Sequence, residues 1–150
     1  MKPDNERLRV EIATELDSDF LIKIDGRLVD DQTRNRFVLG SIPRSECLLC
    51  RADETPAGYA IFNKGFWGEH TFIWLLFTSP QFRRRGVATS LIRYIESKCE
   101  TPKLFISTNQ SNKLMQKLLD KLGFLNTGLV ENFDDGDPEI FYFKKIGKHS

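Results

Sequence analysis

The feature that most constrains the fold of this 150-residue sequence is a nearly continuous run of apolar and β-branched side chains from Glu69 to Thr78 (EHTFIWLLFT). A run without polar alternation is typical of a strand that is buried on both faces of a sheet. Such a strand needs cover on both sides, so we expect helices layered on a sheet. The longest apolar stretch, residues 72–77, is far shorter than the ~20 residues that span a bilayer, so no membrane helix and no membrane partner are expected.

Patterns on either side of this strand predict the order of the other elements. Alternating or short apolar runs predict strands, and apolar side chains three and four residues apart predict helices. The expected strands cover residues 8–14, 47–52, 58–63, 69–78, 103–107, 124–131 and 139–145, and the expected helices begin at Asp17, Asp31, Val87 and Ser111. Residues 52–58 (ADETPAG) are expected to form the turn of a hairpin. This order indicates an α+β sandwich, and the length is that of a single domain over residues 1–150.

The three cysteines bear on metal binding and on the cellular compartment. Their small, odd number argues against a disulfide framework and favours a reducing environment. Cys47 and Cys50 form a CxxC pair, but a zinc site needs two more ligands, and His70 and His149 have no matching spacing. We therefore expect no metal and interpret both thiols as buried strand residues. The first ten residues mix both charge signs with no apolar stretch behind them, so a cytoplasmic protein is expected.

The segment PQFRRRGVA, residues 80–88, joins the buried strand to the helix that begins at Val87 and carries the clearest chemical signal. A strand that turns at a glycine into a helix directs several backbone N–H groups and the positive end of the helix dipole at one point, which suits a phosphate. Gly86 permits close backbone approach, Ala88 keeps the first helical turn open, and the arginines offer forks for phosphate oxygens. A solvated basic loop is the plainer alternative. Neither the Walker motif nor the GxGxxG motif occurs.

The charge distribution agrees with an anion site in this part of the chain. The whole sequence has 22 basic and 21 acidic residues, so its net charge of +1 gives no case for nucleic acid as a partner. Residues 76–125 hold nine of the basic and three of the acidic residues, a net of +6, which leaves 13 and 18, a net of −5, for the rest. An anionic ligand is therefore expected to bind the middle of the chain.

The same segment resembles the signature of a known family. The string Arg83-x-x-Gly86-x-Ala88 at a strand-to-helix junction is similar to the [QR]xxGx[GA] motif of the GNAT superfamily of acetyl-CoA-dependent N-acetyltransferases. Pro80 before it, two asparagines after the next strand, and the LxKLGF ending of the last helix at residues 119–124 are also similar to the family. The resemblance extends over residues 8–146 in element order. It implies a central, mostly antiparallel sheet of six or seven strands with a splayed pair, flanked by about four helices.

The resemblance implies a binding site for acetyl-CoA. In the family the splayed strand offers backbone hydrogen bonds to the pantetheine arm, and the matching residues are Leu76, Phe77 and Thr78. The loop and the first helical turn hold the pyrophosphate, here at Arg83, Arg84, Arg85, Gly86, Val87, Ala88, Thr89 and Ser90. Asn109 and Asn112 match positions that often touch the cofactor, and the helix of residues 114–122 would line the acetyl and thiol end.

The catalytic residues of the family are not carried over as clearly. Many members have a tyrosine four residues before the GF pair, where its hydroxyl protonates the departing CoA thiolate, and this position is Leu119 here. A leucine cannot donate a proton. The central strand has ionisable side chains only at its start, so Glu69 and His70 are the candidate general bases, against the plainer reading of two surface side chains. Because acetyl-CoA is an activated thioester, positioning can supply much of the rate enhancement while protons move through water.

The function implied by the resemblance is an N-acetyltransferase in which an amine attacks acetyl-CoA directly in a ternary complex. The alternative, favoured by Leu119, is a non-catalytic module of the same fold that binds CoA or acetyl-CoA and acts on a protein partner. The acidic segment at residues 131–139 is either a solvated turn or an attraction for a cationic amine. A homodimer would suit the fold. Nothing in the sequence names the acceptor or the length of the acyl group.

Overall fold

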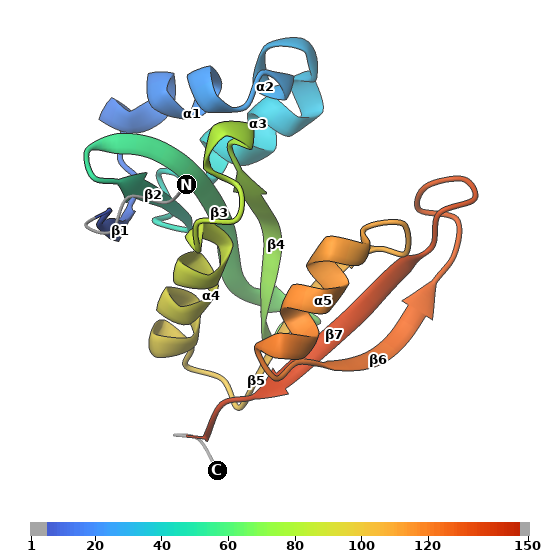
Figure 1. The fold of residues 1–150 in the computed structure, drawn as a ribbon. Helices are drawn as coiled ribbons and strands as arrows, with labels where there is room; N and C mark the ends of the chain where they lie inside the picture. Colours follow the sequence, from blue (N-terminus) through green and yellow to red (C-terminus); the bar gives the residue numbers. More distant parts are fainter. Residues whose placement is uncertain (1–5, 148–150) are drawn as a thin grey trace. The chain divides into compact units, whose positions relative to one another are not determined.

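The structure is a computed structural model that describes residues 6–147. Its seven strands form one mixed sheet in the order β1-β2-β3-β4-β5-β7-β6 (Figure 1). The strands are β1 (Leu8–Ile12), β2 (Cys47–Ala52), β3 (Thr55–Phe66), β4 (His70–Thr78), β5 (Lys103–Asn109), β6 (Leu125–Val130) and β7 (Glu139–Lys145). The helices are α1 (Ser18–Ile24), α2 (Arg27–Asp30), α3 (Gln32–Ser41), α4 (Val87–Lys98) and α5 (Lys113–Lys121), with 3-10 turns η1 (Glu15–Asp17) and η2 (Pro80–Phe82).

The strand pairing confirms the predicted fold class, an α+β fold with a mostly antiparallel sheet. β1 pairs with β2, β2 with β3, β5 with β7 and β6 with β7, all antiparallel, whereas β4 pairs with β5 in parallel. The chain divides into two compact units. Unit 1 comprises residues up to Phe62 together with Leu75–Ile95, and unit 2 comprises Asn63–Trp74 together with the residues from Glu96 onward. The single domain expected over residues 1–150 stays a prediction.

Unit 1 has helices on both faces of its strands (Figure 1). The core beneath α1, α2 and α3 consists of Ala13, Leu21, Leu28, Val38, Ile42, Cys47, Leu49, Tyr59 and Ile61. Leu75 and Phe77 from the end of β4 pack against this core. Because successive strand residues point to opposite faces, Gly58, next to Tyr59, faces α4 instead. A Cβ on Gly58 would lie 2.7 Å from Cγ1 of Val87 and 2.5 Å from the carbonyl oxygen of Phe77, so this glycine permits the close packing of β3, β4 and α4.

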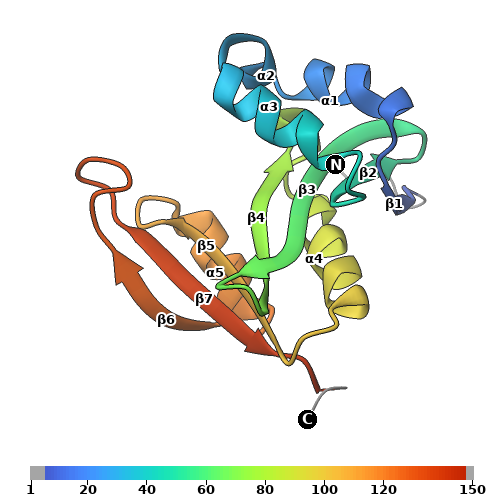
Figure 2. The same cartoon turned by 180° about the vertical axis from the view of Figure 1, so that it is seen from behind.

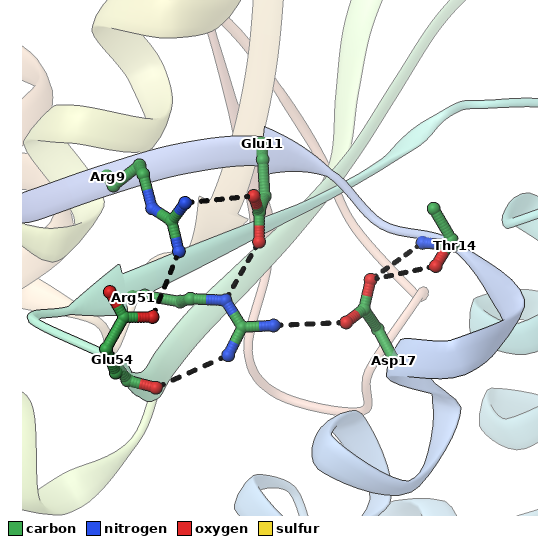
Figure 3. A network of polar contacts seen from close by, with 6 residues as sticks. All are labelled: Arg9, Glu11, Thr14, Asp17, Arg51 and Glu54. Carbon is green, nitrogen blue, oxygen red and sulfur yellow. Dashed lines mark hydrogen bonds and ion pairs between the residues drawn. The ribbon is translucent and has the colours of Figure 1, made fainter.

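A polar network ties β1, β2 and η1 together in unit 1 (Figure 3). Nε of Arg51 donates to Glu11 at 2.8 Å, and Nη2 of Arg51 donates to Asp17 at 3.1 Å. The other carboxylate oxygen of Asp17 accepts from the backbone N–H of Thr14 at 2.8 Å. This network fixes the path of the chain from β1 into the first helices.

In unit 2, α5 packs on one face of the strands (Figure 2). Aromatic rings form a separate cluster. Nζ of Lys144 on β7 donates to the carbonyl oxygen of Leu122 at 2.8 Å, directly after α5. Along β5, Leu104 and Ile106 are buried whereas Phe105 between them is half-buried, so the half-buried ring belongs to the other face. The rings in contact there are Phe66, Phe72, Trp74, Phe105, Phe141 and Phe143. Trp74 is exposed, so β4 is buried on both faces only at residues 71–73.

The helix that was expected to begin at Asp17 is wrong in its extent. The structure divides it at Asp25 and Gly26 into α1 and α2, which raises the number of α-helices within residues 6–147 from the expected four to five. Asp25 has extended backbone torsions (φ −123°, ψ 92°), and its carboxylate accepts from the backbone N–H of Arg27 at 3.2 Å. A short acidic side chain that bonds to the backbone two residues later favours a turn over a continued helix.

Two smaller expectations are also wrong. Most of the expected turn at residues 52–58 belongs to β3, because Ala52 pairs with Thr55 and the turn consists of two residues, Asp53 and Glu54. Asp53 has φ 53°, a left-handed conformation that aspartate tolerates better than most residues. Helix α5 begins at Lys113 with Asn112 as its cap, and not at Ser111 as expected. Leu114 on its first turn is 68% exposed.

Candidate functional site

The strand, loop and helix predicted around residues 80–88 are confirmed as local structure. β4 ends at Thr78, η2 follows, and α4 begins at Val87 after Gly86, whose φ of +86° is left-handed. The backbone N–H of Ser90 donates to the carbonyl oxygen of Gly86 at 2.9 Å, so Gly86 occupies the N-cap position of α4. The N–H groups of the first turn have no acceptor within an α-helix. Several free amides and the positive end of a 12-residue helix therefore meet at this loop.

The three consecutive arginines of the loop differ in their surroundings. Nη1 of Arg85 donates to Glu6 at 3.0 Å, and its guanidinium lies 5.2 Å from the ring centre of Phe82. The side chain of Glu6 is only 4% exposed, so Arg85 belongs to the packing of unit 1. Arg83 and Arg84 are exposed and contact no polar group within residues 6–147. The three arginines therefore differ in what they contact, and the contact of each with a phosphate stays a prediction.

The residues predicted to hold the pantetheine arm lie at the end of β4, in the same unit as the loop. Phe77 packs against the core under α1–α3, so its neighbours Leu76 and Thr78 point to the opposite face of the strand. All three are half-buried. The segment is held to β3 by the backbone N–H of Ser79, which donates to the carbonyl oxygen of Ala57 at 2.8 Å.

The two asparagines predicted to touch the cofactor belong to unit 2 and have local roles there. Nδ2 of Asn109 donates to Asp134 at 2.9 Å, which ties the end of β5 to the connection between β6 and β7. Oδ1 of Asn112 accepts from the backbone N–H of Met115 at 3.1 Å and caps α5. Their contact with a cofactor stays a prediction.

The acidic segment is tethered by several of its carboxylates. Asp137 accepts from both the backbone N–H of Ser111 at 3.0 Å and its hydroxyl at 2.6 Å, and Glu139 accepts from the hydroxyl of Ser107 at 2.7 Å. With Asp134 bound to an asparagine amide, three carboxylates of the segment hold the turn to its own unit. This supports the plainer reading of a structural turn.

The candidate general bases and the position of the missing tyrosine have ordinary surroundings. Nε2 of His70 lies 3.6 Å from Oε1 of Glu69, and its ring contacts Phe105 at a centroid distance of 5.3 Å. His70 is the first residue of β4 and Glu69 directly precedes it, at the opposite end of this strand from Thr78. Their role as bases stays a prediction. Leu119 is fully buried in unit 2, so its side chain is part of a hydrophobic core.

A buried ionic cluster in unit 1 was missed from the sequence. The carboxylate of Asp25, 2% exposed, accepts from the hydroxyl of Tyr59 at 2.6 Å, from Nε and Nη2 of Arg34 at 3.1 and 3.0 Å, and from Nε of Arg27 at 3.2 Å. Burial acts to raise the pKa of Asp25, but the donors Tyr59 and Arg34 and the charge of Arg34 hold it below the usual 3.8. The one available signal was the Asp25-Gly26 pair inside a helical pattern.

Cys47 and Cys50 are buried strand residues, as predicted. Cys47 and Cys50 are both fully buried in β2, and this burial raises the pKa of Cys47 to about 12 and that of Cys50 to about 11. Within residues 6–147, no three His, Cys, Asp or Glu side chains are grouped as metal ligands. His149 and the first five residues lie outside the described part. None of the described helices is long and apolar enough to cross a membrane.

The chain is similar to known acetyltransferases in sequence and in structure. A family model described as the acetyltransferase (GNAT) family matches residues 10–124. A GNAT-family acetyltransferase from Bacillus cereus is 37% identical with a TM-score of 0.85, over 93% of this chain and 97% of that one. No curated protein sequence matches.

Two more distant structures share the fold. The ribosomal-protein-S18-alanine N-acetyltransferase of Escherichia coli is 16% identical, with a TM-score of 0.78 over 93% of this chain and 94% of that one. The PaiA N-acetyltransferase of Thermoplasma acidophilum, solved in complex with coenzyme A, is 15% identical, with a TM-score of 0.72 over 93% of this chain and 99% of that one.

Proposed function

The chain belongs to the GNAT acetyltransferase family, and on this premise we propose that it is an N-acetyltransferase that transfers the acetyl group of acetyl-CoA to an amine in a ternary complex. The observation that carries the proposal is the junction of β4 and α4, where Gly86 in a left-handed conformation opens a helix beside two exposed arginines. Local geometry of this kind suits a phosphate group. A cytoplasmic location and a homodimer remain predictions.

The residues of the junction fit the diphosphate of acetyl-CoA. The amides of Val87, Ala88 and Thr89 would donate to its oxygens, and Arg83 and Arg84 would supply positive charge. A side chain at position 86 would be strained, because φ values near +86° are rarely adopted by residues with a Cβ. The end of β4 at Leu76–Thr78 would hold the pantetheine arm.

Acetyl-CoA, when bound, supplies an activated thioester. The nitrogen lone pair of the neutral amine attacks the carbonyl carbon, the new C–N bond forms, and the C–S bond breaks with the electron pair leaving on sulfur. The amine nitrogen then loses a proton and the CoA thiolate gains one. Since Leu119 is buried and its side chain has no ionisable group, we propose that water accepts and supplies these protons. Alignment of the two substrates would provide most of the rate enhancement.

Calorimetric titration of acetyl-CoA into variants of the loop tests the binding site. Arg84→Ala and Gly86→Asp should each weaken binding at least about tenfold, because the first removes a charge–phosphate contact and the second adds strain and negative charge. Arg36→Ala is the matched control, since Arg36 is exposed on α3 and contacts no polar group within residues 6–147. Unchanged affinity in both loop variants would overturn the site.

Thiol release from acetyl-CoA in the presence of a panel of amines tests the reaction. Turnover with any amine well above the hydrolysis background is the expected result. Tight acetyl-CoA binding without turnover on any amine would overturn the enzyme and favour the alternative, a binding module of the same fold. This alternative is tested because Leu119, which cannot donate a proton, is buried at the position where many family members have the proton-donating tyrosine.

A further inference from the structure

Arg27, at the start of α2, presents an anchored guanidinium at the surface of unit 1. Its Nε donates to Oδ1 of Asp25 at 3.2 Å, and its guanidinium carbon lies 5.4 Å from the ring centre of Phe77. The side chain is nevertheless 59% exposed. Within residues 6–147, its Nη1 and Nη2 atoms donate to no group, so the fork of the guanidinium is free. An arginine held in place at one edge and free at the other is prepared to bind a planar anion.

The charges of the cluster leave a positive surplus at this arginine. Two guanidinium groups, of Arg27 and Arg34, share the single negative charge of Asp25. Arg34 directs Nε and Nη2 into the protein, toward Asp25, and only 19% of its side chain is exposed. Arg27 therefore presents the second guanidinium group of the cluster to solvent. Asp30 and Asp31 follow one helical turn later and form no ion pair with it within residues 6–147, so the exposed guanidinium can bind an external anion.

The location of Arg27 separates it from the proposed diphosphate site. The ring beneath it belongs to Phe77, on the strand segment that the proposed function assigns to the pantetheine arm. This ring lies on the α1–α3 side of the strands, whereas α4 packs on the other side, where Gly58 approaches Val87. An anion at Arg27 is therefore not the diphosphate at the start of α4. The other molecule that must come to this strand is the acceptor.

We infer that the acceptor is an amine that also carries a carboxylate, and that Arg27 binds this carboxylate with the free fork of its guanidinium. The inference rests on the proposed function. Asp25 is then a positioning residue, which orients Arg27 without touching the substrate. One free guanidinium suits a carboxylate, with a single negative charge, better than a doubly charged phosphate.

Pairs of acceptors that differ only in the carboxylate test the inference. Suitable pairs are β-alanine with β-alaninamide, and 4-aminobutyrate with its amide. The value of kcat/KM is calculated for the neutral form of each amine, because replacing the carboxylate by an amide already lowers the pKa of the amine in the same molecule. In the pairs that are good substrates, kcat/KM should be at least about tenfold higher for the carboxylate than for its amide, which is the usual size of a charge-assisted contact.

Variants at position 27 show whether this arginine causes the preference. Arg27→Gln should reduce it to below about twofold, and Arg27→Lys should retain part of it, since lysine keeps the charge but not the fork. Neither variant should change the Kd of acetyl-CoA. Arg36→Gln is the matched control and should keep the full preference. Thermal unfolding shows whether each variant folds. If one of the two Arg27 variants does not fold, the substrate preference of the other one tests the inference.

The outcomes separate the inference from the proposed function. Acetylation of amines with no preference for carboxylates, or a preference that survives Arg27→Gln, would overturn the inference and leave the acetyltransferase intact. Loss of acetyl-CoA affinity in the Arg27 variants would assign the arginine to the cofactor and also overturn it. If wild-type protein acetylates no amine in the panel, the proposed function fails and the inference fails with it.

Discussion

The hydroxyl of Tyr59 on β3 donates a 2.6 Å hydrogen bond to Oδ2 of Asp25, which lies 34 residues earlier between α1 and α2. Both side chains are buried. A buried carboxylate is costly unless charge and hydrogen bonds compensate for its lost solvation. Here Tyr59, Arg34 and Arg27 provide that compensation, and the cluster fixes α2 and α3 to β3.

The stability supplied by Asp25 should depend on pH in a definite direction. Because its pKa is lower in the folded protein than the usual 3.8, its contribution is complete well above pH 3.8 and is lost as the pH falls through the folded-state pKa. Asp25→Asn should reduce the free energy of unfolding by about 3 kcal/mol at pH 7, since two guanidinium groups lose their counter-ion. Urea unfolding at pH 7, 5 and 3 checks this. Asp30→Asn, at an exposed position, serves as the control. A difference in free energy of unfolding between wild type and Asp25→Asn that grows as the pH falls would contradict the prediction.

Gly58→Ala should destabilise unit 1 by about 1–3 kcal/mol, as expected for overpacking. The new methyl group would lie 2.5 Å from a backbone carbonyl oxygen, which cannot move aside as easily as a side chain. Gly40→Ala is the matched control, because a Cβ there meets nothing within 4 Å and the residue lies in α3. The control should be neutral or slightly stabilising. Chemical denaturation of both variants measures the free energies of unfolding. Equal values for Gly58→Ala and Gly40→Ala would contradict the close packing of Gly58 against α4.

Arg85 and Arg84 should differ in what their loss affects. Arg85→Ala removes the partner of Glu6, a carboxylate whose buried Oε2 has no hydrogen bond within residues 6–147. The loss should cost about 2 kcal/mol of stability. Arg84→Ala should leave the melting temperature unchanged and weaken acetyl-CoA binding, with a shallower salt dependence than wild type. Thermal unfolding and titration at two salt concentrations give both quantities. A stable Arg85→Ala protein would show that the ion pair with Glu6 contributes little.

Leu119→Tyr tests whether the family's proton donor can be restored by one substitution. Leu119 is fully buried, so a larger polar ring should overpack the core of unit 2 and cost about 1–3 kcal/mol. We expect a lower melting temperature and no increase in kcat. Leu119→Met is the volume-conserving control and should cost less. A clear rise in kcat with unchanged stability would show instead that this position opens to the substrate.

Local signals allowed much of the fold to be predicted. The seven strands and α4 follow from apolar periodicity, and Gly123 ends α5 with φ +93°, as a glycine after a helix often does. The prediction failed at Asp25, where the helical spacing continues but the chain turns. A local bond from the backbone N–H of Arg27 and a distant bond from Tyr59 both hold the carboxylate there, and only the local bond lies within reach of a sequence pattern.

The sequence by itself determined the family, the class of fold and the loop where a phosphate group is expected, because these depend on short patterns and on backbone requirements such as that of Gly86. Only the tertiary structure separated Arg85, bound to Glu6 79 residues away, from its two exposed neighbours. It alone assembled Asp25 with Tyr59 and the arginines that share its charge. The physical reason is that burial and electrostatic compensation depend on distances in space, and residues remote in the chain supply the partners.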